Sequence, residues 1–512
     1  MKIIKNLWKD YAFTISISIG FLVFQFILNL FGGYGYFRDE FYYISCSNNL
    51  DWGYVDHPPF SIFLLWMNRI ILGDSIFSIR LLPALATSGL IILSGFLVKE
   101  IGGNRFAQIL TSLSIFFAPV YLAMSSFFSM NVFEPLFWTA LILLLLMIIR
   151  TRNQRFWIIF WLIASIGIYN KYCIVFFIFA LLLSLIISSN RKVLFNKWFV
   201  FGVIISFLVL IPNILWQYFN HFPTLEFLRN AQNLKNLSFT PLDFLSSQIL
   251  FQNPVIFPIW FTGLIVLIFN KNFRRFNYLG IAFIILFFLL VFQNGKPYYL
   301  SPIFPAILSA GAVFLESITK YKNFKFLIRF YTVLIILGGI LFLPMSSPIL
   351  PIPAFLKYSK ILGINIPKME RHKDTPLPQV FADRFGWEEM TQKVSQVYNT
   401  LTTAEKSKTI IYARNYGEAG AIQFFGKKYN LPDIVSGHNN FWLWGIKNHN
   451  ADILIIVGGD ELDHQEFFKS VQLKAIHSNK YAMPFETDLP IYICKYPKQP
   501  IDSIWKYVKT YI

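Results

Sequence analysis

The residues best suited to chemistry lie between positions 37 and 59, directly after the first strongly apolar run. Two acids, Asp39 and Glu40, are adjacent there, and Asp56 and His57 follow in the same stretch. A carboxylate beside lipid is costly unless it has a task, and a partly desolvated one can act as a general base. We therefore expect Asp39 to carry out chemistry at the membrane surface, within a site built by the other membrane segments.

The two adjacent acids, Asp39 and Glu40, cannot both face one point on a regular helix. If the segment is helical, one acid can address a substrate while the other caps the helix or forms an ion pair. We keep both as candidate catalytic residues. The alternative is a solvated pair of loop acids matched with Arg38.

Aromatic residues and prolines surround these acids, among them Trp52, Pro58 and Pro59. Prolines stiffen the chain and aromatic rings favour the membrane interface, which is typical of an interfacial re-entrant segment. Trp and Tyr rings are also natural stacking partners for sugars. We expect five side chains to contact the substrate or to support the catalytic acid: Tyr42, Tyr43, Tyr54, Asp56 and His57.

Three further ionisable residues lie at the ends of apolar runs. Glu134 is a lone acid there, which either faces a polar cavity and joins the substrate site or caps the start of a helix. Lys171 and Lys296 are either ordinary snorkelling lysines or cations that hold a phosphate as point charges. We group Tyr298 and Tyr299 with these two lysines as candidate phosphate-binding residues.

Several kinds of site have no signature in the sequence. We find no Gly-rich phosphate loop, HExxH, CxxC or nucleophile elbow. The cysteines Cys46, Cys173 and Cys494 are scattered and form neither a metal-ligand spacing nor a disulfide framework. Since nothing indicates a soluble nucleotide site, an activated donor must come from the membrane.

The elements that position these residues are membrane spans. Of the 512 residues only 14% are charged and 55% are hydrophobic, whereas about 25% are charged in soluble proteins. Several apolar runs approach or exceed the ~18–20 residues needed to cross a bilayer. We predict a polytopic α-helical membrane protein with about eleven spans, at 11–31, 76–98, 107–123, 131–149, 156–169, 172–189, 198–219, 247–270, 277–294, 300–318 and 326–343.

The net charge of +18 comes mainly from Lys and Arg in short loops. This is the positive-inside pattern, and we expect no nucleic-acid partner. Basic clusters fall in every second loop, which places the N-terminus in the cytoplasm and the candidate residues outside. The first run lacks a cleavage pattern and is predicted to be a retained span. Merging 156–169 and 172–189 into one span would invert every later loop.

Composition changes near residue 344. We predict a transmembrane domain over 1–343, a Pro-rich linker over 344–364 and a soluble extracytoplasmic α/β domain over 365–512. In the last of these, 409–413 and 452–457 are expected to be buried strands. The segments 388–398 and 418–425 are expected to be helices, and such alternation indicates an α/β fold.

At these residues the chain resembles a known family. The stretch from Asp39-Glu40-Phe41-Tyr42-Tyr43 to Gly53-Tyr54-Val55-Asp56-His57-Pro58-Pro59 resembles the first-loop signature of bacterial polyprenyl-phosphate-sugar-dependent glycosyltransferases. These belong to the GT-C superfamily, with protein O-mannosyltransferases and aminoarabinose transferases as relatives. Three further parts are similar to family motifs: Gly295-Lys296-Pro297-Tyr298-Tyr299-Leu300, Asn170-Lys171-Tyr172, and the C-terminal segments 385–387, 415–421 and 436–440.

The resemblance implies an inverting transfer of a sugar from a polyprenyl phosphate to a lipid A, glycan or protein acceptor. It implies a bacterial cytoplasmic (inner) membrane, with the C-terminal domain periplasmic or extracellular. Asp39 would deprotonate the acceptor, and Lys171 and Lys296 would hold the lipid phosphate. Glu134 stands where many relatives carry an acid. Metal dependence differs among relatives, so a divalent cation stays open.

Two other functions compete with this interpretation. A transporter or flippase of a lipid-linked saccharide should place ionisable groups near the bilayer midplane, commonly with broken helices. The predicted clustering at one surface favours catalysis instead. A sensor or structural protein, in which the C-terminal domain does the work, is the third class.

Overall fold

The structure is a computed structural model that describes residues 2–363, 368, 370, 371, 373 and 375–512. The chain forms two compact units. The helical unit comprises Met1–Gly33, Asp74–Trp216 and Asn236–Met369, and the mixed unit comprises Tyr34–Gly73, Gln217–Lys235 and Glu370–Ile512. The loop after the first helix therefore groups with the C-terminal segment. The predicted linker boundary at 364/365 lies outside the described residues.

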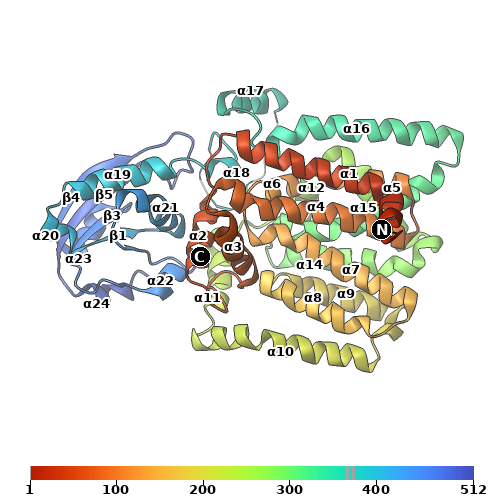
Figure 1. Cartoon of the computed structure of the whole chain (residues 1–512), viewed down its shortest axis with the longest axis horizontal. Coiled ribbons are helices and arrows are strands. Elements are labelled where there is room, and N and C mark those ends of the chain that lie inside the picture. The colour runs from red at the N-terminus through yellow and green to blue at the C-terminus, as the bar shows by residue number, and fades with distance from the viewer. Residues whose placement is uncertain (1, 364–367, 369, 372, 374) are drawn as a thin grey trace. The chain divides into compact units, whose positions relative to one another are not determined.

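The helical unit contains the long apolar helices (Figure 1). Seven described helices are long and apolar enough to cross a membrane, counting the short turns that precede three of them. They are α1 (Lys2–Phe31), α4 (Ile76–Ile101), α7 (Glu134–Thr151), α10 (Lys197–Phe219), α14 (Asn277–Phe292), α15 (Phe304–Ile318) and α16 (Lys322–Ser346).

Two further predicted spans are bent pairs of helices. The pair α5 (Arg105–Phe116) and α6 (Pro119–Ser125) is bent by 60°, and α12 (Pro241–Phe251) bends by 97° relative to η4–α13 (Pro254–Phe269). Pro119 and Pro254 stand at the two breaks. Because proline has no N–H and disfavours a helical residue before it, each span is interrupted there.

The last two predicted spans are α8 (Phe156–Asn170) and α9 (Ile174–Ile187), of 15 and 14 residues. At 1.5 Å per residue these helices are roughly 20 Å long, less than the ~30 Å of a bilayer core. Every predicted apolar run is thus helical, but seven to nine described elements meet the length and composition of a span, fewer than the predicted eleven.

The mixed unit is built on a five-stranded sheet in the order β2-β1-β3-β5-β4. Strand β1 pairs in parallel with β2 and β3, whereas β5 is antiparallel to β3 and β4. The predicted strands at 409–413 and 452–457 are confirmed as β1 and β3. The bounds are β1 (Thr409–Ala413), β2 (Ile434–Val435), β3 (Ile453–Val457), β4 (Phe468–His477) and β5 (Leu489–Pro497).

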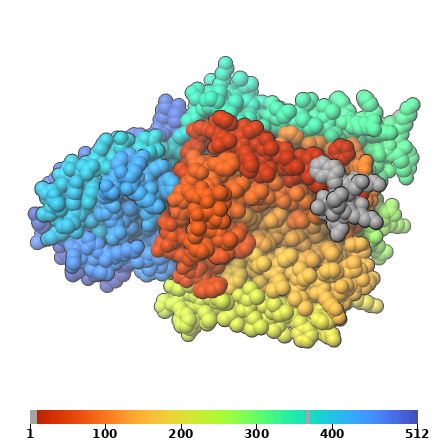
Figure 2. All heavy atoms as spheres, in the orientation of Figure 1, coloured from red at the N-terminus to blue at the C-terminus, as the bar shows by residue number. Residues whose placement is uncertain are grey.

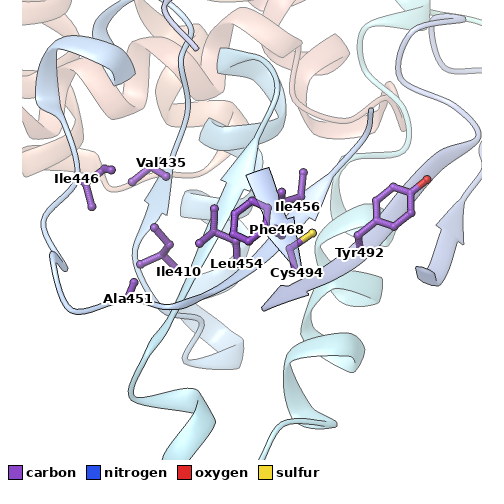
Figure 3. Packing of buried hydrophobic residues seen from close by; sticks show 9 residues of the cluster. All are labelled: Ile410, Val435, Ile446, Ala451, Leu454, Ile456, Phe468, Tyr492 and Cys494. Atoms are coloured by element: carbon purple, nitrogen blue, oxygen red, sulfur yellow. The ribbon is translucent and has the colours of Figure 1, made fainter. Parts of the chain in front are cut away.

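The central strands β1 and β3 are buried on both faces, whereas the edge strand β4 is largely exposed. Nine buried side chains on one face form the cluster drawn in Figure 3, including Ile410 on β1, Leu454 on β3 and Cys494 on β5. Trp505 of α24 (Ile501–Trp505) packs against the cluster. Helices α19 (Trp387–Asn399) and α21 (Tyr416–Phe425) also contact the sheet. The two predicted helices and the α/β fold are therefore confirmed.

Helices α2 (Arg38–Asn48) and α3 (Phe60–Leu72) follow α1 in the chain but belong to the mixed unit. Figure 2 shows their orange atoms directly beside the blue atoms of the C-terminal segment. Helix α2 packs on α21 at two glycines. A Cβ added at Gly417 would lie 2.4 Å from Arg38 Cγ, and one at Gly420 would lie 2.9 Å from the Phe41 carbonyl carbon.

The remaining helices of the mixed unit are short, of eight residues or fewer. They are α11 (Pro223–Asn230), α18 (Gln379–Ala382), α20 (Thr403–Lys406), α22 (Asn440–Trp444) and α23 (Glu461–Phe467). In the helical unit α17 (Ile352–Leu362) follows α16.

Candidate active site

Asp39 lies in the first turn of α2, and its side chain is 31% exposed. Its Oδ1 accepts a hydrogen bond from the Tyr416 hydroxyl at 2.9 Å, and Arg38 Nε lies 3.7 Å from the same oxygen. Among the described residues, Oδ2 has no hydrogen-bond or ion-pair partner. One oxygen of this carboxylate is therefore held, while the other is available to a substrate.

Arg38 links Asp39 to a second acid, Asp383. The Arg38 backbone N–H donates to the Asp383 carbonyl oxygen at 2.9 Å, and Arg38 Nη1 lies 4.0 Å from Asp383 Oδ1. The Arg38 guanidinium also lies over the Tyr416 ring, 5.2 Å from its centroid. Burial raises the pKa of Asp383 to about 6, although Arg38 opposes this shift. Arg38 is thus shared between two carboxylates.

Glu40, the second acid of the pair, is fully buried. Its Oε2 accepts a hydrogen bond from the Phe37 backbone N–H at 2.8 Å, which closes the first turn of α2. A carboxylate in the first turn also complements the helix dipole. The segment is therefore helical, with Glu40 as its cap and Asp39 towards Tyr416. Glu40 thus caps the helix, and its catalytic role stays a prediction.

Tyr42 connects Asp56 to the C-terminal segment. Its hydroxyl donates to Asp56 Oδ1 at 2.7 Å and lies 3.1 Å from Asn440 Oδ1. The Val55 N–H donates to the same Asn440 oxygen at 2.7 Å. The Tyr42 and Tyr416 rings lie 4.8 Å apart. Burial raises the pKa of Asp56, which His57 opposes.

His57 is completely buried among aromatic rings. The centroids of Tyr54 and Tyr43 lie 4.8 and 5.0 Å from its ring. Its Nδ1 lies 3.1 Å from the Pro58 carbonyl oxygen, and its Nε2 lies 3.9 Å from Asp56 Oδ1. Burial lowers the pKa of His57, so the neutral imidazole dominates at pH 7. His57 therefore fixes the shape of the loop that carries Asp56.

The second group of predicted residues lies in the helical unit. Lys171 follows α8, and its side chain is 9% exposed. Its Nζ donates to Asn131 Oδ1 at 2.9 Å and lies 3.5 Å from Glu134 Oε2, at the start of α7. The Tyr299 ring centroid is 4.0 Å from Nζ, and that of Tyr298 is 5.6 Å away. This buried ammonium is therefore enclosed by an amide, an acid and two rings.

Lys296 precedes η6 (Pro297–Ile303), the turn that carries Tyr298 and Tyr299. The Lys296 carbonyl oxygen accepts from the Tyr299 N–H at 2.9 Å, and Gln248 donates to the Pro297 carbonyl oxygen at 2.9 Å. Lys171 and the two tyrosines are thus brought together, and Lys296 begins the turn that presents those tyrosines.

The predicted residues therefore fall into two groups. Asp39, Tyr42, Tyr43, Tyr54, Asp56 and His57 gather in the mixed unit, and Glu134, Lys171, Lys296, Tyr298 and Tyr299 belong to the helical unit. Sequence reasoning missed three partners of the first group, Asp383, Tyr416 and Asn440. Two of them lie in segments 415–421 and 436–440, whose Gly- and Asn-rich motifs were a signal without an assigned chemistry.

A divalent cation finds few ligands in the part of the chain that the structure describes. No group of three or more His, Cys, Asp or Glu side chains is arranged there to hold a metal ion. Near Asp39 the neighbouring polar groups are a cation and a phenol, Arg38 and Tyr416, which do not suit a divalent cation.

Comparison with known proteins finds one family profile that matches part of the chain, and solved structures with the same fold. Residues 56–216 match the sequence profile of the family described as dolichyl-phosphate-mannose-protein mannosyltransferase. No curated protein matches the chain.

Among solved structures, ArnT from Cupriavidus metallidurans bound to undecaprenyl phosphate is similar, with a TM-score of 0.59 and 14% identity over 94% of this chain and 97% of that chain. The apo state of the same protein gives a TM-score of 0.60, also at 14% identity, with the same coverage of both chains. The arabinofuranosyltransferase AftD from Mycobacteria gives 0.56 at 10% identity, over 96% of this chain and 40% of that chain.

At these identities the structural likeness shows the fold. It confirms the predicted fold class, a multi-pass helical membrane protein with a C-terminal α/β region. Together with the family profile it also confirms the predicted resemblance and the predicted enzyme class, a membrane glycosyltransferase.

Proposed function

We propose that the chain is an inverting glycosyltransferase that moves a sugar from a polyprenyl phosphate to an envelope acceptor. Asp39 carries this proposal, because its carboxylate is partly exposed, held through Oδ1 and available through Oδ2. Asp39 removes the proton from an acceptor hydroxyl or phosphate. The acceptor oxygen then attacks the anomeric carbon, and the bond to the polyprenyl phosphate breaks with its electrons on the leaving phosphate.

The lysines bind the lipid phosphate in this proposal. An ammonium has three N–H donors, and Asn131 and Glu134 occupy two of those of Lys171. The third is offered to a phosphate oxygen if the Tyr299 ring, 4.0 Å away, gives way. Lys296 adds a second cation from the turn that bears Tyr298 and Tyr299. A compact ammonium suits phosphate as a point charge. The ArnT structure with bound undecaprenyl phosphate supports this choice of donor.

The location follows from the charge pattern of the loops. Lys and Arg gather in alternate loops, which by the positive-inside rule face the cytoplasm. We propose a bacterial inner membrane, with Asp39 and the C-terminal segment on the outer side. The acceptor is an envelope lipid, glycan or protein, to be identified by the experiment below.

The test is sugar transfer by the purified protein. It is incubated with several polyprenyl-phosphate sugars and envelope extracts, and mass spectrometry identifies what becomes glycosylated. Asp39→Asn should lower the rate by about 10²–10⁴-fold, the usual contribution of a general base. Asp51→Asn is a matched control, because Asp51 lies in the same segment and bonds locally to the Trp52 N–H. Full activity of the Asp39→Asn enzyme would remove Asp39 as the base.

A transporter of lipid-linked saccharides is the second candidate, because two predicted spans are bent pairs of helices. Liposomes containing the pure protein and a fluorescent polyprenyl-phosphate sugar distinguish the two functions. A transporter moves the label across the bilayer without any acceptor, whereas a transferase releases polyprenyl phosphate only when an acceptor is present.

A further inference from the structure

The strand order of the sheet in the mixed unit resembles that of α/β proteins that bind ligands at a sheet edge. Its parallel strands run in the order β2-β1-β3, so the connections after β1 and β2 leave in opposite directions. In open α/β sheets, ligands bind at such a switch point, beyond the carboxyl ends of the strands. Strand β1 ends at Ala413, and the loop that follows it leads directly to Tyr416.

Helix α2 packs against α21, the helix that follows β1 at this edge of the sheet. Tyr416 of α21 reaches Asp39, and Asn440, beyond the end of β2, reaches Tyr42 and the Val55 N–H. The edge at which many α/β proteins bind a ligand is therefore in contact with the helix that bears the catalytic carboxylate.

Hydrogen bonds at the start of α21 fix the backbone that carries Tyr416. Asn415 caps α21, since its Oδ1 accepts from the N–H groups of Gly417 and Glu418 at 2.8 and 3.0 Å. The Asn415 amide in turn donates to Glu418 Oε1 and Glu486 Oε1 at 2.9 and 3.0 Å. These bonds fix the first turn of α21 and therefore the direction of the Tyr416 side chain.

The Tyr416 ring is also fixed by packing. Its centroid lies 4.8 Å from the Tyr42 ring and 4.8 Å from the His438 ring, and the side chain is almost fully buried. Burial, and to a smaller extent Asp39, raise the pKa of Tyr416 well above its usual value, so the phenol remains a hydrogen-bond donor at neutral pH. A buried and aligned O–H is thus directed at Asp39 Oδ1.

We propose that the C-terminal α/β segment completes the active site, and that Tyr416 is the positioning residue for Asp39. Tyr416 fixes Oδ1, so the carboxylate presents Oδ2 to the acceptor in one orientation. It also stabilises the ionised carboxylate, which is the form that accepts a proton. The inference rests on the proposed function, because it assigns to Asp39 the role of base.

Loss of one hydrogen bond to a charged group should lower kcat by about 10- to 100-fold. Tyr416→Phe removes the hydroxyl and keeps the ring, so the packing against Tyr42 and His438 survives. The KM for the lipid donor should change by less than about 3-fold, because Tyr416 lies outside the lysine group. The acid limb of the pH–rate profile should move to higher pH, because the ionised carboxylate loses a donor.

Other charged and titratable groups around Asp39 could also shift the pH–rate profile. They are Arg38, Asp56, His57, Asp383 and Tyr416. Incorporation of 3-fluorotyrosine at position 416 separates the hydroxyl from these neighbours. It keeps the ring and strengthens the O–H as a donor, so it should move the acid limb to lower pH, opposite to Tyr416→Phe.

The experiment compares four full-length proteins: wild type, Tyr416→Phe, the 3-fluorotyrosine protein and Tyr492→Phe. Tyr492 is a matched control, a buried tyrosine in the core cluster of the same unit. If Asp39→Asn is inactive but Tyr416→Phe and the 3-fluorotyrosine protein both keep the wild-type kcat and pH profile, the inference about Tyr416 is wrong while the proposed function stands. If Asp39→Asn is fully active, the proposed function fails first. Should Tyr416→Phe not fold, the fluorotyrosine profile decides.

Discussion

The contact between α2 and α21 makes Gly420→Ala the sharpest test of the structure. A Cβ added there would lie 2.9 Å from both the carbonyl carbon and the Cβ of Phe41, and 3.0 Å from its carbonyl oxygen. Two of these three atoms are backbone, so no side chain can rotate to make room. The helices must move apart by about 0.5 Å to reach an ordinary contact of 3.4 Å.

The cost follows from overpacking. Forcing an additional methyl group into a packed contact costs about 1–3 kcal/mol. Alanine regains up to ~1 kcal/mol over glycine inside a helix, which offsets part of this. Gly426→Ala is the matched control, because its closest neighbour is the flexible end of Leu431 at 3.0 Å. The two variants should differ by the steric cost, about 1–3 kcal/mol, or roughly 2–10 °C in Tm.

Thermal unfolding in detergent measures this difference, with sugar transfer as the second readout. Gly420→Ala should have the lower Tm and a reduced kcat, because α21 carries Tyr416. Gly426→Ala should keep both close to wild type. If Gly420→Ala is as stable as Gly426→Ala and fully active, α2 does not pack on α21 as described, and Tyr416 loses its placement.

Much of the helical unit could be predicted from composition alone. Long apolar runs identify spans because a bilayer leaves no other partner for the backbone than the helix itself. Length was the weaker signal, since α8 and α9 are helical but too short to cross a bilayer core unaided. The breaks at Pro119 and Pro254 were not predicted, since 107–123 and 247–270 were expected to be unbroken spans. Proline alone does not locate a break, because Pro83 and Pro212 lie inside the continuous helices α4 and α10.

The assignment of the two acids needed the structure. Asp39 and Glu40 are adjacent in the sequence, so their side chains must point in different directions on a regular helix. Which of them is buried depends on how the helix packs, and the structure buries Glu40 while Asp39 stays 31% exposed.

The grouping of residues 34–73 with the C-terminal segment could not be predicted from local patterns. The hydrogen bond between Asp39 and Tyr416 joins residues 377 positions apart in the sequence. Hydrophobic periodicity shows which face of a helix is buried but not which element buries it. Gly417 and Gly420 were a local signal of this packing, because small residues spaced along a helix allow another backbone to approach closely.

Two further predictions concern single side chains. Lys171→Gln removes the ammonium but keeps an amide near Asn131, so the Kd for undecaprenyl phosphate should rise about 10- to 100-fold. Calorimetry measures this Kd. The control is Lys320→Gln, because Lys320 is exposed. The last prediction concerns Glu418, which shares the Asn415 amide with Glu486 in a buried pair. Burial raises the pKa of Glu418 from 4.5 to about 7. Between these values the unfolded carboxyl is ionised while the folded one is still protonated, so the unfolded state binds fewer protons and stability falls as pH rises from about 4.5 to about 7. Glu418→Gln cannot ionise and should flatten the dependence of Tm on pH over this window. An equally steep decline in wild type and variant would show that Glu418 is ionised in the folded protein.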